Sequence, residues 1–182
     1  KTILDAQLAD GGWDLSAENS DPDMTAMVLQ ALAPYYGTNA EVKSAVDEAL
    51  KCLSDLQNSD GGYASWGTTN SESCAQVITA LTALGIDPDN DSRFVKNGNS
   101  VVDAFLSFYV EGGGFAHVAG GGVNGMATEQ GYYTLAAYSR WVNGQTSLYD
   151  MSDVEIEAGG NTDSGDNTGE EPAAKPDTGN AP

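Results

Sequence analysis

Basic residues are scarce in this 182-residue chain, which has seven Lys and Arg against 27 Asp and Glu and a formal net charge of -20. Nucleic acids and anionic membrane surfaces are bound by clustered Lys and Arg, so the charge argues against both as partners. No apolar run approaches the length of a transmembrane helix, and no charged start followed by an apolar stretch marks a signal peptide. We therefore expect no membrane insertion by this segment.

Cysteine is also rare, with two residues that belong to no metal-spaced cluster. Cys52 falls near the end of one predicted helix and Cys74 near the start of the next, so an antiparallel hairpin could bring them together. Two interpretations stay open: a Cys52–Cys74 disulfide, or two small buried apolar side chains.

What the chain does contain is an internal repeat of about fifty residues. A glycine pair runs directly into an aromatic residue three times, at Trp13, Tyr63 and Phe115. The first two copies align without a gap over residues 7–13 and 57–63, each as a Gln-x-x-Asp-Gly-Gly-aromatic motif. The repetition indicates three similar structural units.

Each glycine pair is followed by a charge-free stretch, at residues 24–32, 74–84 and 130–138, and helices there must be covered on nearly every side. Residues 41–57 and 100–109 instead place their apolar side chains on one stripe, which is typical of surface helices. We predict helices at about 1–8, 22–35, 40–57, 71–85, 98–110 and 126–142. The three charge-free helices should be the more buried, and the chain should have essentially no sheet.

The periodicity disappears from about Asp153, where the chain becomes rich in Gly, Asn, Thr, Ser, Pro and acidic residues. Such a segment has too little apolar area to offset its ordering entropy. We therefore assign residues 1–150 to one repeat domain and residues 151–182 to a disordered acidic linker, whose deletion should leave the thermal midpoint unchanged. The first residues read as the end of a helix, so we expect the natural chain to extend upstream.

The motif of a glycine-aromatic loop, a charge-free helix and an amphipathic helix resembles the repeats of the α/α-toroid superfamily of prenyltransferases and squalene/hopene cyclases. In detail, Gly85-Ile86-Asp87-Pro88 and Met126-Ala127-Thr128-Glu129-Gln130 look like the prenyltransferase-like repeats of Gram-positive bacterial cell-surface proteins.

This resemblance covers roughly residues 1–145 and implies an all-α fold, a partial α/α toroid of about three helix-pair repeats with an inner and an outer layer. It also implies an extracellular location, at the cell surface or cell wall of a Gram-positive bacterium. Because about three repeats fill only about half of a closed toroid, more chain, a partner or a second copy should cover the open edge.

The residues that would carry the superfamily's chemistry are largely missing. Cyclases protonate a polyene with the middle aspartate of Asp-x-Asp-Asp-Thr-Ala, which Asp23 matches, but Met24 replaces the last aspartate. Protein prenyltransferases bind zinc through Asp, Cys and His, and the only histidine here is His117 in a glycine-rich loop. Thioester domains join a cysteine to a glutamine three residues on, whereas Gln76 lies two residues after Cys74. We expect no cofactor, and any enzyme would be a cyclase-like isomerase using Asp23.

Two further motifs are incomplete. Asp87, Asp89 and Asp91 alternate as at the start of a calcium loop, but the twelfth position is a glycine where a bidentate glutamate is needed. A solvated turn is the other interpretation. Residues 175–182 are similar to a sortase sorting signal of the Leu-Pro-x-Thr-Gly type with lysine in place of leucine, and the alternative is an ordinary linker end.

We therefore expect a noncatalytic module that binds a small molecule or a surface protein. The first alternative is a cyclase- or prenyltransferase-like enzyme acting on an isoprenoid, and the second is a structural spacer of a surface protein. The ligand-binding candidates, each of whose aromatic members could instead fill the core, are Trp13, Asp23, Tyr63, Trp66, Glu72, Phe115, Glu129, Tyr132 and Tyr133. For Asp23 we expect a solvent-facing carboxylate that caps its helix, so Asp23→Asn should cost about 0.5 kcal/mol.

Overall fold

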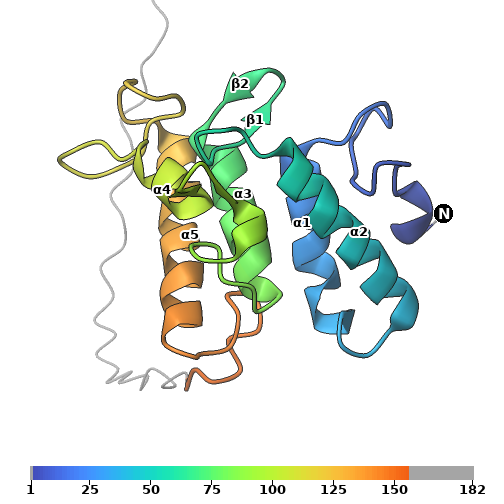
Figure 1. Ribbon diagram of the computed structural model, residues 1–182. Coiled ribbons are helices and arrows are strands. Elements are labelled where there is room, and N and C mark those ends of the chain that lie inside the picture. The colour runs from blue at the N-terminus through green and yellow to red at the C-terminus, as the bar shows by residue number, and fades with distance from the viewer. Residues whose placement is uncertain (1, 156–182) are drawn as a thin grey trace, which may run out of the picture.

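The computed structural model describes residues 2–155 of the chain. Within them lie five α-helices, three single-turn 3-10 helices and four two-residue strands (Figure 1). The α-helices are α1 (Pro22–Leu32), α2 (Ala40–Leu56), α3 (Ser71–Ala83), α4 (Val101–Leu106) and α5 (Gly125–Val142). The 3-10 helices are η1 (Leu4–Ala6), η2 (Ala33–Tyr35) and η3 (Ser92–Phe94).

Two small antiparallel sheets contradict the predicted all-α toroid, so the described fold is mixed α/β. One sheet pairs β1 (Ala64–Ser65) with β2 (Thr68–Thr69), and the other pairs β3 (Val95–Lys96) with β4 (Asn99–Ser100). Period-two alternation cannot be recognised in strands of two residues, which is why the sequence pattern gave no sign of them. A different signal was present for the second hairpin, because its turn is Asn-Gly.

Two of the predicted helices are shorter in the structure than expected. Residues 1–8 were expected to be helical, but only the single turn η1 forms there. The predicted helix at 98–110 begins later, because Asn99 and Ser100 pair in β4 before Ser100 caps α4. Ser100 and Asp103 form a capping box that fixes this start. The predictions for α1, α2, α3 and α5 are confirmed to within three residues at each end.

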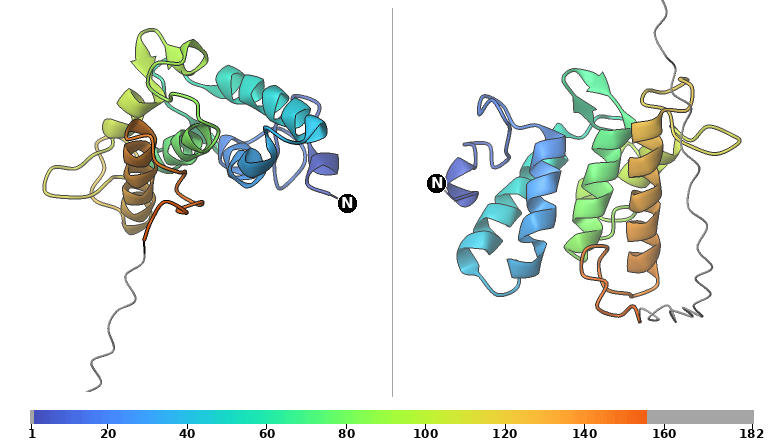
Figure 2. Two further views of the ribbon diagram at one scale, coloured as in Figure 1. Left: turned by 90° about the horizontal axis from the view of Figure 1, so that it is seen from below. Right: turned by 180° about the vertical axis from the view of Figure 1, so that it is seen from behind.

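Helices α1, α3 and α5 lie side by side in one row with α3 in the middle, and α2 and α4 pack on one side of that row (Figures 1 and 2). Burial follows this position. Helix α3 is buried from Ser71 to Thr82 except at Gln76, and α1 is more buried than the amphipathic α2. The prediction fails for α5, whose buried residues are Ala127, Gly131, Thr134 and Ala137, because α5 ends the row and has α3 on one side alone.

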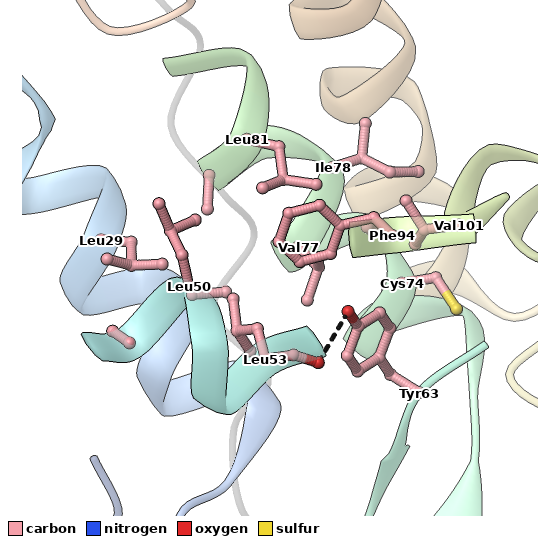
Figure 3. Close-up of a cluster of buried hydrophobic side chains, with 14 of the residues drawn as sticks. Leu29, Leu50, Leu53, Tyr63, Cys74, Val77, Ile78, Leu81, Phe94 and Val101 are labelled. Carbon is pink, nitrogen blue, oxygen red and sulfur yellow. Dashed lines mark hydrogen bonds between the residues drawn. The ribbon is translucent and has the colours of Figure 1, made fainter. Parts of the chain in front are cut away.

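The core fills the space between the row and α2 (Figure 3). Tyr63 is fully buried there, and its hydroxyl donates to the carbonyl of Leu53 at 3.0 Å. Cys74 lies in the same core, where burial raises the pKa of its thiol to about 12. Cys52 is also buried, and both cysteines are free thiols. They are therefore two small buried side chains and do not form the disulfide that the sequence left open.

The three glycine-aromatic loops share two backbone hydrogen bonds. In each one, an N–H donates to the carbonyl of the second glycine at 2.9 Å, from Leu8, Asn58 and Val110. The carbonyl of the aromatic residue then accepts the N–H of a helix N-cap, which is Asp21 for α1, Asn70 for α3 and Asn124 for α5. The repeat therefore brings the starts of the three row helices to one end of the molecule.

Residues 146–153 follow α5 and fold back onto it. The Arg140 guanidinium donates to the Asp153 carboxylate, which also accepts the Thr146 hydroxyl at 2.6 Å. Asp153, which lies near the start of the predicted linker, is thus tied to the helical part of the chain. Residues 156–182 of the predicted linker, which include the sequence similar to a sorting signal, lie outside the described residues.

Candidate functional site

The second residues of the three row helices are Asp23, Glu72 and Met126, and all three line one cleft of about 300 Å³. We call it the helix-start cleft. Its lining side chains come from the helix starts, the β1–β2 hairpin and the loop before α5, and they are Asp23, Ser65, Trp66, Thr68, Asn70, Glu72, His117, Met126 and Gln130. The repeat thus places equivalent positions at one site, although the residue differs in each copy.

Asp23 is free for another role because Asp21 caps α1. The Asp21 carboxylate accepts the N–H groups of Asp23 at 2.9 Å and Met24 at 3.1 Å, and its other oxygen accepts the Ser65 hydroxyl at 2.5 Å. The expectation that Asp23 would be a solvent-facing cap is therefore wrong. Asp23 is half-buried, and its Oδ1 accepts no hydrogen bond from any described residue.

The environment of Asp23 disfavours its charged form. Burial, followed by the nearby carboxylates of Asp21 and Glu72, raises its pKa to about 6, and the neighbouring Ser73 hydroxyl opposes this shift. Asp23 is thus a carboxyl group that faces a cleft and has a raised pKa. Perturbed groups of this kind are concentrated at functional sites, where the fold tolerates their cost.

Glu72 and His117 form a second polar unit in the cleft. The buried Glu72 carboxylate accepts the Ser71 hydroxyl at 3.1 Å, and the same oxygen lies 2.9 Å from His117 Nδ1. The carbonyl of His117 accepts the Ser71 N–H at 3.1 Å, so the loop is also held by its backbone. These contacts orient the imidazole, and no group of three His, Cys, Asp or Glu side chains within residues 2–155 could hold a metal ion.

Trp66 stands at the tip of the β1–β2 hairpin, at the edge of the cleft, with 90% of its surface exposed. Its backbone has φ +52°, in the left-handed region that bulky residues rarely adopt. Left-handed backbone costs an L-residue on the order of 1 kcal/mol, and an exposed ring regains none of this through packing. The turn therefore gives no structural reason for a tryptophan at this position.

The structure brings only three of the predicted binding residues to this cleft, namely Asp23, Trp66 and Glu72. Trp13, Tyr63 and Phe115 are buried in the core, because the tight glycine turns aim the following aromatic ring inward. Glu129 and Tyr132 are exposed on α5 outside the cleft. The remaining candidate, Tyr133, belongs to a neighbouring groove.

The sequence analysis missed a row of glutamines that crosses the three row helices. Gln30 Nε2 donates to Gln76 Oε1 at 2.9 Å, and Gln76 Nε2 donates to Gln130 Oε1 at 3.1 Å and to the Tyr133 hydroxyl at 2.6 Å. These are the only glutamines in the charge-free stretches, and that rarity was the available signal. Gln130 also lines the helix-start cleft, so the row connects it to a groove of about 540 Å³ lined by Met27, Gln30, Ala31, Pro34, Gln76, Tyr133 and Tyr149.

The three aspartates of the suspected calcium loop are used locally. The Asp87 carboxylate accepts the Asp89 N–H at 2.9 Å, Asp89 accepts the Ser100 hydroxyl at 2.6 Å, and Asp91 pairs with Arg93 at 2.7 Å. These contacts are those of a hydrogen-bonded turn, which was the other interpretation of this segment.

In the part of the chain that the structure describes, no helix has both the length and the apolar character needed to cross a membrane. This agrees with the prediction that the segment does not insert. No family model matches the chain, and no solved structure matches it.

The geometry limits the chemistry available in the helix-start cleft. Two carboxylates and an imidazole face the cleft, whose lining contains no Lys or Arg and includes the apolar side chains of Trp66 and Met126. Such a lining favours a ligand that donates hydrogen bonds or carries positive charge next to an apolar part.

Proposed function

We propose that this chain is a noncatalytic binding module of a bacterial cell-surface protein and that its ligand occupies the helix-start cleft. One observation carries the proposal: the half-buried Asp23 carboxyl group, whose charged form is disfavoured by burial and by two nearby carboxylates, lines a cleft edged by the exposed Trp66. A carboxylate in such surroundings and an exposed ring both cost stability unless a ligand uses them.

The surroundings of these two residues support a preformed site. Glu72 is buried and already oriented by His117 and Ser71, and Asn70 is held by its role as the N-cap of α3. Ligands bind more tightly where the contacting side chains lose little freedom. The cell-surface location rests on the resemblance to prenyltransferase-like repeats of Gram-positive surface proteins, and it remains part of the proposal.

A second candidate function is an enzyme in which Asp23 donates a proton, and the raised pKa of Asp23 favours it. A polyene substrate would also need a cavity lined by apolar side chains throughout, whereas Ser65, Thr68 and Gln130 place polar groups in this cleft beside Trp66 and Met126. Met24 stands where the cyclase motif has its last aspartate, so no second carboxylate follows Asp23 at that position. For these reasons the binding module remains the first choice, ahead of both the enzyme and a spacer.

The test is a binding screen followed by mapping of the site. Fluorescently labelled protein is applied to arrays of cell-wall glycans and peptides, and each hit is titrated by NMR with the indole N–H of Trp66 as the reporter. We expect at least one hit to shift this signal and to bind at least fivefold more weakly to Trp66→Ala. Tyr132→Ala is the matched control, because Tyr132 is an exposed aromatic residue outside the cleft, and it should bind normally.

The competing functions give different results in the same experiments. Turnover of a polyprenyl substrate that disappears in Asp23→Asn would overturn the binding module in favour of the enzyme. Hits that bind Trp66→Ala and the wild type equally would place the binding surface elsewhere. A complete absence of hits at the cleft would favour the spacer.

A further inference from the structure

We propose that the helix-start cleft recognises a protonated alkylamine, such as the side chain of lysine in a peptide. This inference rests on the proposed function and specifies the class of its ligand. The cleft combines two carboxylates, a lining without Lys or Arg and an exposed aromatic side chain at its edge within about 300 Å³. An ammonium group on a short alkyl chain complements these features.

The charges of the cleft lack a counterion. Asp23 comes from α1 and Glu72 from α3, and the capping carboxylate of Asp21 lies next to them. His117 is the only basic side chain in the lining, and it contacts Glu72 at 2.9 Å. Asp23 therefore has two carboxylates as neighbours and no basic partner. A cation bound beside Asp23 would relieve this repulsion in a setting where little water can screen it.

Hydrogen bonding favours an ammonium group over other cations. Carboxylate oxygens accept hydrogen bonds, and a primary ammonium carries three N–H groups to donate, whereas a quaternary ammonium carries none. A metal ion would need several ligands, and no suitable group of three occurs within residues 2–155. A guanidinium binds best to a carboxylate with two accessible oxygens, but the Asp23 Oδ1 is buried.

Trp66 supplies the remaining contact. Its ring is held at the edge of the cleft by a hairpin turn whose backbone is strained at that residue. Tryptophan is the best aromatic partner for a cation, and its face also covers the apolar part of an alkyl chain. Contact with a bound alkylammonium group would therefore explain why a tryptophan occupies this strained position.

The experiment uses three small probes titrated into the protein at pH 7.5 and followed through the Trp66 indole and Gln130 side-chain signals. Nα-acetyl-lysine N-methylamide carries the ammonium group, the norleucine analogue is uncharged, and tetramethylammonium is charged but has no N–H. We expect the lysine probe to bind with a Kd on the order of 1 mM and the other two at least tenfold more weakly.

Variants and pH test the role of Asp23 directly. Asp23→Asn should weaken binding of the lysine probe at least tenfold, whereas Glu129→Gln, which removes an exposed carboxylate outside the cleft, should leave the Kd unchanged. Protons compete with the ammonium at Asp23, whose neighbours are Asp21, Glu72, His117 and Ser73. The affinity should therefore fall about tenfold per pH unit once the pH drops below the Asp23 pKa of about 6.

The outcomes separate this inference from the proposed function. Equal binding of the norleucine probe or of tetramethylammonium, or an unchanged Kd in Asp23→Asn, overturns the assignment of an alkylamine. If a neutral glycan or peptide shifts the cleft signals while the lysine probe does not, the inference fails and the binding module stands. If no compound shifts any cleft signal, both fail.

Discussion

The β1–β2 and β3–β4 hairpins have the same backbone and different residues at their tips. Both turns have two residues with positive φ, +52° and +78° at Trp66–Gly67 and +51° and +83° at Asn97–Gly98. Asn-Gly is the pair that this turn favours, because asparagine tolerates the left-handed region and glycine has no Cβ. Tryptophan has neither advantage. The first hairpin therefore carries a residue that its turn disfavours.

The surroundings of the hairpins differ in the same sense. The β3–β4 hairpin is tied to the rest of the fold, since Asn97 Nδ2 donates to the Ser59 carbonyl at 3.0 Å and Lys96 Nζ donates to the Ser54 hydroxyl at 3.1 Å. The tip of β1–β2 instead exposes Trp66 beside the helix-start cleft. One hairpin is stabilised by hydrogen bonds to the rest of the fold, and the other has a strained, exposed residue next to the helix-start cleft.

The largest effect on stability should come from Asp23, which lines the same cleft as the β1–β2 hairpin. Its pKa is about 6 in the folded chain against 3.8 for the free side chain, so the folded state binds this proton more tightly. This group's contribution to the free energy of unfolding is therefore lost as the pH rises from about 4 to 6. Asp23→Asn should raise the free energy of unfolding by about 2 kcal/mol at pH 7.5, after allowance for partial exposure, and by little at pH 4.

Urea denaturation of Asp23→Asn and wild type at both pH values measures this difference, with Glu129→Gln as a control that should stay within about 0.5 kcal/mol of wild type. The sign is opposite to the small loss expected from the sequence, because Asp21 and not Asp23 caps the helix. A variant that is less stable at pH 7.5 would show that the Asp23 carboxylate is stabilised in the fold.

The next effect tests the stabilised hairpin. Asn97→Trp puts into β3–β4 the residue that β1–β2 carries, and it also removes the hydrogen bond to the Ser59 carbonyl. Together, the strained backbone and the lost bond should cost about 1.5 kcal/mol, measured by urea denaturation. An unchanged stability would mean that the left-handed position tolerates tryptophan freely, and the contrast between the hairpins would disappear.

The reverse change, Trp66→Asn, should be smaller and opposite in sign. It relieves the strained backbone without removing any packing, because Trp66 is exposed, so we expect a gain of about 1 kcal/mol in the free energy of unfolding. The same variant should lose affinity for every ligand of the helix-start cleft. A gain in stability with full binding would show that Trp66 has no role in recognition.

The smallest effect compares the two turn glycines. A Cβ added at Gly67 or Gly98 would meet nothing within 4 Å, and both residues have φ near +80°. Each Gly→Ala variant should therefore lose about 1 kcal/mol, and the two losses should agree within about 0.5 kcal/mol. Thermal unfolding of the two variants checks this. A larger loss at either position would show that the turns differ in backbone strain as well as in sequence.

Local sequence signals were sufficient for most of the helices. The caps at Asp21, Asn39 and Asn70 and the apolar stripe of α2 act over a few neighbouring residues, so their effect can be read from the chain. The glycine-aromatic repeat likewise predicted three equivalent loops, and these have the same hydrogen bonds. The Asn97–Gly98 turn was readable in the same way, although the sequence analysis did not use it.

The tertiary structure decided the properties that depend on residues far apart in the chain. Glu72 and His117 are 45 positions apart, and only the packing of the α5 loop on α3 brings them to 2.9 Å. The aromatic residues after the glycine pairs could have faced a ligand or the core, and tertiary packing buries all three of them in the core.

For Asp23, the sequence determined its place at the start of a helix, but not its protonation. Burial is set by which elements converge on a side chain, and charge repulsion is set by which carboxylates they bring along. Neither quantity is encoded by spacing along one helix. The sequence by itself therefore determined the repeats, the main helices and the excess of negative charge, while the arrangement of α1, α3 and the β1–β2 hairpin decided which carboxylates line the helix-start cleft.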